Sequence, residues 1–111
     1  MSIELYADYL KEREDGHMIY DSHGFMSYFI KGDECYIRDV YIEPAFRKTH
    51  HATMFMLKVS SHAKQLGCKK LTGSVRPSSN GSTDSLKVLL SAGFKLWYSS
   101  QDAIFFFKEL E

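Results

Sequence analysis

Residues 40–52 read VYIEPAFRKTHHA and mark the point at which a strand gives way to a helix. The strand must end by Pro44, because proline has no N–H to donate to a neighbouring strand. After Pro44 the apolar residues recur every three or four positions, at Ala52, Phe55, Met56, Val59, Ala63 and Leu66. This period predicts a helix from about Thr49 to Gln65 that buries one face. Thr49 is the expected N-cap, and Gly67 is expected just past the end.

Three short, aromatic-rich runs precede this helix. They are HMIYDS (17–22), FMSYFIK (25–31) and CYIRDVYI (35–42), and a pair of turn residues that includes a glycine separates each run from the next. Runs of this length and composition predict antiparallel strands joined by tight turns. Before them we expect a short helix that begins after Ser2 and ends at Asp15-Gly16, because its apolar residues have helical spacing.

The part of the chain after the long helix alternates again between strand and helix. CKKLTGSV (68–75) predicts a strand that lies parallel to 35–42, because a helix connects the two. The remaining expected elements are a loop over 77–82, a helix over 85–91 and a hairpin formed by 94–98 and 103–108. The order α-β-β-β-α-β-α-β-β predicts an α/β fold with a mixed central sheet, in a single domain over residues 1–111.

The composition excludes several classes of protein. The chain has 111 residues, of which 44% are hydrophobic and 14% aromatic, which is enough for a core and excludes disordered and collagen-like chains. No apolar run approaches the roughly 18 residues that a membrane-spanning helix needs. The acidic N-terminus lacks the pattern of a signal peptide, and Cys35 and Cys68 are too few for a disulfide framework. We therefore expect a soluble cytoplasmic protein with no membrane partner.

The formal net charge is zero, but the charges are divided along the chain. Residues 1–43 have a net charge of −6, residues 44–90 a net charge of +7 and residues 91–111 a net charge of −1. This division fits two interpretations, and the sequence leaves both open. Either the basic middle third binds something anionic, or the acidic and basic thirds neutralise each other in the fold.

The order of elements and the motif at 40–52 resemble the GNAT superfamily of acyl-CoA-dependent N-acyltransferases, over roughly residues 4–110. In that family a strand, one residue and a proline lead into Arg/Gln-x-x-Gly-x-Gly/Ala at the start of a helix. Here Arg47 and Ala52 match the outer positions, and His50 stands where the central glycine is expected. Ala92-Gly93-Phe94 resembles the Gly-Phe pair that precedes the family's last hairpin.

The resemblance implies that the protein binds acetyl-CoA as its cofactor. A helix N-terminus has unpaired N–H groups and a partial positive charge, which together favour phosphate binding. By the resemblance, the backbone of Val40, Tyr41 and Ile42 would pair with the pantetheine arm. The residues expected around the pyrophosphate are Arg47, Lys48, Thr49, His50, His51 and Ala52. A histidine at position 50 places a Cβ where glycine would let the backbone approach the phosphates.

The resemblance also implies an N-acetyltransferase that acts on a primary amine, with a protein amine as one option because the acceptor wall is short. Leu89 replaces the tyrosine that many members use as general acid. Some members have a glutamate that acts as the catalytic base on the next parallel strand, but Thr72-Gly73-Ser74 has no carboxylate there. Asp39 and Glu43 are the remaining candidates for a catalytic base. The alternative is a GNAT-fold protein that has lost catalysis and serves in binding or assembly.

Other patterns support weaker hypotheses. No metal site is expected, because His50 and His51 point about 100° apart on a helix and lack nearby ligands. Nucleic acid is not an expected partner, since the isoelectric point is about 7 and the acidic first third would repel a long polyanion. Phe105, Phe106 and Phe107 are expected at a sheet edge through which two copies form a homodimer.

Overall fold

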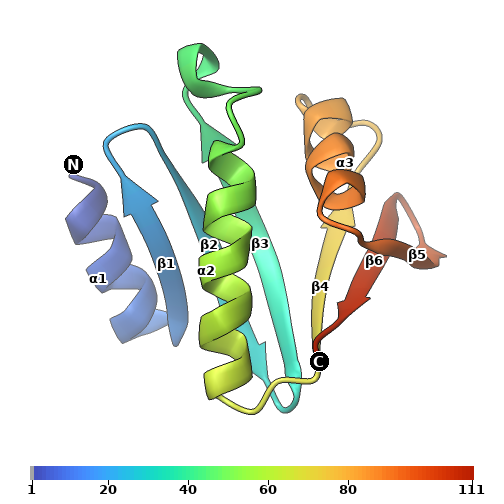
Figure 1. Ribbon diagram of the computed structural model, residues 1–111, viewed down its shortest axis with the longest axis horizontal. Coiled ribbons are helices and arrows are strands. Elements are labelled where there is room, and N and C mark those ends of the chain that lie inside the picture. Colours follow the sequence, from blue (N-terminus) through green and yellow to red (C-terminus); the bar gives the residue numbers. More distant parts are fainter. Residues whose placement is uncertain (1) are drawn as a thin grey trace.

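The computed structural model describes residues 2–111 and contains one six-stranded sheet with three α-helices. The elements are α1 (Ile3–Arg13), β1 (Gly16–Asp21), β2 (Gly24–Lys31), β3 (Glu34–Ile42), a short 3-10 helix (Pro44–Phe46), α2 (His51–Gln65), β4 (Lys70–Val75), α3 (Ser82–Ser91), β5 (Lys95–Ser100) and β6 (Ala103–Glu109). The strands lie in the order β1-β2-β3-β4-β6-β5, and β3–β4 is the parallel pair (Figure 1). The predicted mixed α/β fold is therefore confirmed.

The two faces of the sheet are covered differently. On the face that we call the α2 face, α2 lies across β1, β2 and β3, and α3 lies against β4 (Figure 1). Met26, Ile37 and Leu71 point to this face and pack with Phe55 and Val59 of α2 in the main core. Because neighbouring residues in a strand point to opposite faces, Phe25 lies on the other side, where its ring meets Tyr6 of α1. We call this second side the α1 face.

Local chemistry explains most element boundaries, with two differences from the sequence prediction. The Ser2 hydroxyl accepts a hydrogen bond from the Leu5 N–H and caps α1 as expected. Thr49 does not cap α2; its hydroxyl donates to the Phe46 carbonyl at 2.6 Å, and the N-cap is His50. The third helix begins at Ser82, three residues before the predicted start, because the left-handed Gly81 just before it turns the chain.

The expected position of the phenylalanine run is wrong. Residues 105–107 belong to β6, which pairs with β4 on one side and with β5 on the other, so they do not lie at a sheet edge. The edge strand on this side of the sheet is β5, all six residues of which are exposed. No helix in residues 2–111 is long and apolar enough to cross a membrane.

A pair of histidines links α2 to the first strands. The His17 ring stacks on Tyr28, with ring centroids 5.3 Å apart, and meets His62 of α2 edge-on. Burial raises the pKa of Tyr28 to about 12, so its hydroxyl stays protonated, and the hydroxyl shares a hydrogen bond of 2.7 Å with His62 Nδ1. Burial, and then the neighbouring His62, lower the pKa of His17 below its ordinary value of 6.5.

These contacts predict a loss of stability in mild acid. A histidine with a lowered pKa binds its proton more readily in the unfolded chain, so its contribution to stability is complete above pH 6.5 and falls as the pH drops through its lowered pKa. His17→Phe keeps an aromatic ring at this position but cannot titrate. Urea unfolding at pH 7.5 and 5.5 should show a smaller loss of unfolding free energy for the variant than for the wild type. Equal losses would exclude His17 as the cause.

Candidate functional site

The parallel strands β3 and β4 separate partway along their length. They pair from Glu34 with Lys70 to Ile37 with Gly73, whereas β3 continues to Ile42. The ends of the two strands diverge in Figure 1, and the loop that leads into α2 lies at the same end. We call this end the open end of the sheet. Beyond Ile37, β3 is paired with β2 on one side only, so its other edge has backbone groups that no β4 residue pairs.

A bulge interrupts β3 where this divergence begins. Ser27 of β2 pairs with Asp39 and Tyr28 pairs with Ile37, so Arg38 is an extra residue in β3. A bulge places two consecutive residues opposite one and breaks the alternation of side chains. The side chains of Arg38 and Asp39 therefore both lie on the α1 face, where they contact each other.

The loop from Glu43 to His50 has an unusual backbone. Lys48 and His50 both have positive φ angles, of 63° and 64°, and the left-handed conformation costs a non-glycine residue about 1–2 kcal/mol. No side chain caps α2, because His50 makes no such hydrogen bond. The first N–H groups of α2 thus face the open end without a capping side chain, which is the local arrangement that favours an anion.

Arg47 lies between the end of β3 and the start of α3. Its Nε donates to the Ile42 carbonyl at 2.9 Å, and its guanidinium lies over the Tyr41 ring and 3.8 Å from a carboxylate oxygen of Asp84. Lys48 follows Arg47 in the loop, and Arg76 follows the last residue of β4 at the same end of the sheet. Three cationic residues from two segments therefore lie at the open end.

The structure favours neither of the two interpretations of the charge division in full. Lys64, Lys69 and Lys70 lie at the opposite end of the sheet from the loop, near the end of α2 and the start of β4. The basic middle third is therefore not one anion-binding surface. Direct ion pairs do not support the interpretation that the acidic and basic thirds neutralise each other. Within residues 2–111, no Lys or Arg of 44–90 lies within 4 Å of an acidic group of 1–43.

The adjacent histidines of the motif differ in environment. His50 is exposed at the N-cap. His51 is largely buried, and its Nε2 lies 2.7 Å from an oxygen of Asp21 at the end of β1. The ring of His51 therefore points toward the β1–β2 turn. Only the backbone N–H of His51 is left for an anion at the start of α2. Ala52 is half-buried and packs against the core.

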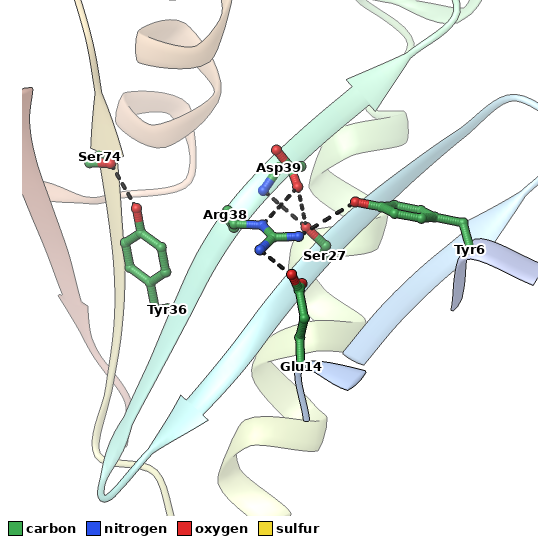
Figure 2. A network of polar contacts seen from close by, with 7 residues as sticks. All are labelled: Tyr6, Glu14, Ser27, Tyr36, Arg38, Asp39 and Ser74. Atoms are coloured by element: carbon green, nitrogen blue, oxygen red, sulfur yellow. Dashed lines mark hydrogen bonds and ion pairs between the residues drawn. The ribbon is translucent and has the colours of Figure 1, made fainter. Parts of the chain in front are cut away.

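The two candidate bases, Asp39 and Glu43, have different surroundings. Figure 2 shows Asp39 on the α1 face, where its carboxylate accepts hydrogen bonds from Ser27 at 2.8 Å and from Arg38 at 3.2 Å. Arg38 in turn contacts Glu14 and Tyr6. Glu43 lies beyond β3, with its carboxylate 3.5 Å from the ring of His23. Of the two, Asp39 is the one within the segment of β3 that β4 leaves unpaired.

A pair of hydroxyl groups connects the two strands just where they part. The Tyr36 hydroxyl of β3 and the Ser74 hydroxyl of β4 are 2.9 Å apart on the α1 face (Figure 2). Sequence reasoning missed both residues, together with Ser27 and Asp21. The only signal in the sequence was the turn Asp21-Ser22-His23-Gly24, in which an aspartate commonly accepts backbone N–H groups.

Leu89 and the histidines answer two questions that the sequence raised. Leu89 is buried in α3, and its side chain packs on Gly73 of β4, so this position is part of the core. In residues 2–111 no three His, Cys, Asp or Glu side chains form a group that could hold a metal ion. Cys35 and Cys68 are both buried free thiols, and burial raises the pKa of Cys35 to about 12, which makes it a poor nucleophile.

The mixed sheet and its parallel pair β3–β4, followed by the motif at the start of α2, are the features by which the sequence resembles the GNAT acyltransferases. Residues 3–89 match the acetyltransferase (GNAT) family, so the chain belongs to this family. Comparison with curated proteins gave no match.

Solved structures share this fold. The PaiA N-acetyltransferase of Thermoplasma acidophilum, in complex with coenzyme A, is 14% identical with a TM-score of 0.74, over 98% of this chain and 80% of that one. A putative GNAT-family acetyltransferase of Desulfovibrio desulfuricans is 14% identical with a TM-score of 0.79, over 97% and 78%. The anti-CRISPR protein AcrVA5 is 18% identical with a TM-score of 0.69, over 84% and 97%. At these identities the likeness shows the fold alone.

Proposed function

We propose that this chain transfers the acetyl group of acetyl-CoA to a primary amine, and that the amine belongs to a protein or peptide. The family uses acetyl-CoA as its acyl donor. The observation that supports the proposal most is the open end of the sheet, where the unpaired edge of β3 adjoins the uncapped start of α2. Backbone groups of Val40, Tyr41 and Ile42 would pair with the pantetheine arm, and the loop from Arg47 to Ala52 would hold the pyrophosphate.

The loop offers two kinds of contact to a pyrophosphate. Arg47 and Lys48 supply cationic groups, and the start of α2 supplies backbone N–H groups at the positive end of the helix dipole. Thr49, His50 and His51 would contribute their backbone, because the Thr49 hydroxyl and the His51 ring already have partners within the protein. This assignment keeps all six residues of the motif and makes Arg47 the main side-chain ligand.

The acyl donor, when bound, supplies a thioester that an amine can attack, forming a C–N bond as the C–S bond breaks. The protein's task is to place a neutral amine beside this thioester. We assign Asp39 as the base that takes the proton from the amine, because it lies on the α1 face beside the point where β3 and β4 separate. Glu43, beside His23, is the weaker candidate for this role.

The shape of the α1 face supports a large acceptor. α1 contacts β1, and the aromatic residues further along this face are open to solvent: Trp97 and Tyr98 are 41% and 46% exposed. Trp97 meets Phe107 of β6 edge-on, and Tyr98 stacks on Phe105. These two phenylalanines pair with Thr72 and Ser74 of β4. An open, aromatic surface on the same face of the sheet accommodates an extended peptide better than an enclosed small molecule.

Calorimetric titration with acetyl-CoA tests the function. The wild type should bind with a micromolar dissociation constant, or about −8 kcal/mol, and should release free thiol when a lysine peptide is added. Arg47→Ala should weaken binding about tenfold, because a charge-assisted contact contributes about 1.5–3 kcal/mol. Arg13→Ala is the matched control, since Arg13 in α1 pairs only with its neighbour Glu12 among residues 2–111. No heat at millimolar acetyl-CoA would contradict the proposal and favour a binding or assembly role.

The conformation of His50 gives a second prediction for the same assay. Its positive φ angle suits glycine, and its Cβ lies where the loop would approach the phosphates. His50→Gly should therefore bind acetyl-CoA about threefold to tenfold more tightly. His50→Asn is the control, because asparagine also tolerates the left-handed conformation but keeps the Cβ, and it should bind as the wild type does. Equal affinity of His50→Gly and wild type would show that the side chain does not narrow the loop.

A further inference from the structure

The β1–β2 turn lies against the loop that leads into α2, and three contacts described here join them. The Glu43 N–H donates to the His23 carbonyl at 2.8 Å, and the His23 ring stacks on Phe46 with centroids 3.6 Å apart. The third contact is a polar one between side chains. Nε2 of His51, the first residue of α2, lies 2.7 Å from Oδ2 of Asp21. These contacts all join the turn to the 43–51 segment.

Asp21 is itself held firmly in place. Its other carboxylate oxygen, Oδ1, accepts the N–H groups of His23 at 2.8 Å and of Gly24 at 3.1 Å, which fixes the turn. Burial raises the pKa of the Asp21 carboxyl, but the hydrogen bonds from the His23 N–H and the His51 ring outweigh burial and leave the pKa below its ordinary value of 3.8. Asp21 is thus an anion at neutral pH and can only accept, so His51 Nε2 must be the donor.

His51 is well placed to transmit this anchoring to the loop. Its side chain is 16% exposed, and its ring also meets Phe55 of the core edge-on at 4.9 Å. The residues just before it have the strained backbone of Lys48 and His50. Strained backbone persists only where the surrounding structure fixes it, and the Asp21–His51 hydrogen bond fixes the end of the strained segment.

We propose that Asp21 and His51 form a latch that holds the phosphate-binding loop in its binding conformation, so that both act as positioning residues for acetyl-CoA. The inference rests on the proposed function for its effect on binding, and on the geometry alone for its effect on the loop. Asp21 reaches the loop directly through the His51 ring and indirectly through the β1–β2 turn, which its Oδ1 holds.

Two substitutions at His51 separate the hydrogen bond from the side chain's bulk. His51→Phe keeps a ring against Phe55 but has no N–H to donate to Asp21. His51→Gln keeps a donor at a similar reach. We expect His51→Phe to weaken acetyl-CoA binding about tenfold and His51→Gln to stay within about twofold of the wild type. Asp21→Asn retains an oxygen for the turn, and adding it to His51→Phe should cause no further loss, because the two residues act as one unit.

His62→Phe provides a matched control on the same helix. It removes a hydrogen bond of the same length, 2.7 Å from Tyr28, near the other end of α2. It should lower the free energy of unfolding as His51→Phe does, but leave acetyl-CoA affinity within twofold. If His62→Phe weakens binding as much as His51→Phe, or if His51→Phe binds like the wild type, there is no latch.

Amide NMR spectra of the ligand-free proteins test the latch independently of binding. In His51→Phe the amide resonances of residues 46–52 should shift and broaden, because the loop samples other conformations, whereas in His62→Phe they should stay at their wild-type positions. Unchanged loop resonances in His51→Phe would overturn the latch. A wild type with no affinity for acetyl-CoA would instead overturn the proposed function, and the spectra would still decide the latch.

Discussion

An Asp39→Asn variant should bind acetyl-CoA as tightly as the wild type and transfer the acetyl group about 100-fold more slowly. Asparagine has the size of aspartate and can keep the contact with Ser27, but its amide cannot accept a proton from an amine. General base catalysis contributes about 10²–10⁴ in rate, and the lower figure applies because positioning of the amine remains. The measurement is a steady-state assay of thiol release with a lysine peptide, together with calorimetry for affinity.

Glu43→Gln is the control for this prediction. Glu43 lies at the same end of β3 but beside His23, so its removal should change kcat by less than about twofold. Urea unfolding of both variants shows whether any loss of rate comes from lost structure, since Asp39 also contacts Arg38. A folded Asp39→Asn variant with wild-type kcat would remove Asp39 from the mechanism and leave transfer to positioning alone.

Gly24→Ala should lower the free energy of unfolding by about 3 kcal/mol, at the upper end of the range for inserting a group into a packed site. A Cβ at this position would lie 2.4 Å from the Tyr41 carbonyl oxygen and 3.1 Å from the Ile42 Cα. Both are backbone atoms of β3, so no change of rotamer relieves the clash and the strand must move. Because Tyr41 and Ile42 precede the loop, acetyl-CoA binding should also weaken.

Gly73→Ala is the matched substitution for this test. Gly73 is also a strand glycine, but its added Cβ would be tight only against the Leu89 side chain, at 3.3 Å, and would lie at ordinary contact distance, 3.8 Å, from the Ile37 carbonyl oxygen. A leucine side chain can shift by a few tenths of an ångström, so we expect a loss of less than about 1 kcal/mol. The measurement is urea unfolding of both variants. Equal losses would show that backbone contact at Gly24 is not the determining feature.

The sequence predicted the order of elements because each signal is local. Pro44 stops a strand, glycines separate the hairpins, and the change of apolar period after residue 50 marks α2. The family motif likewise depends on neighbouring residues. Features that depend on residues far apart in the chain could not be read in this way, as the Asp21–His51 contact shows, because its partners are 30 positions apart.

The errors have the same origin. Thr49 has the chemistry of an N-cap, but the chain continues through a left-handed His50 before α2 begins, and no local pattern announces that turn. The phenylalanines at 105–107 suggest an edge because consecutive strand residues point to opposite faces and expose at least one ring. Their strand nevertheless inserts between β4 and β5. The basic residues are grouped in the middle third of the sequence, but folding places Lys64, Lys69 and Lys70 away from the candidate site.

The most direct test of the account is an amide NMR titration of the wild-type protein with coenzyme A. We predict that the resonances of residues 38–42 and 47–53 shift, because these are the unpaired end of β3 and the start of α2. The resonances of β1 and β2, apart from those of the turn that joins them, should stay unchanged. Shifts confined to other segments, or no shifts at millimolar coenzyme A, would contradict the claim that the open end of the sheet is the cofactor site.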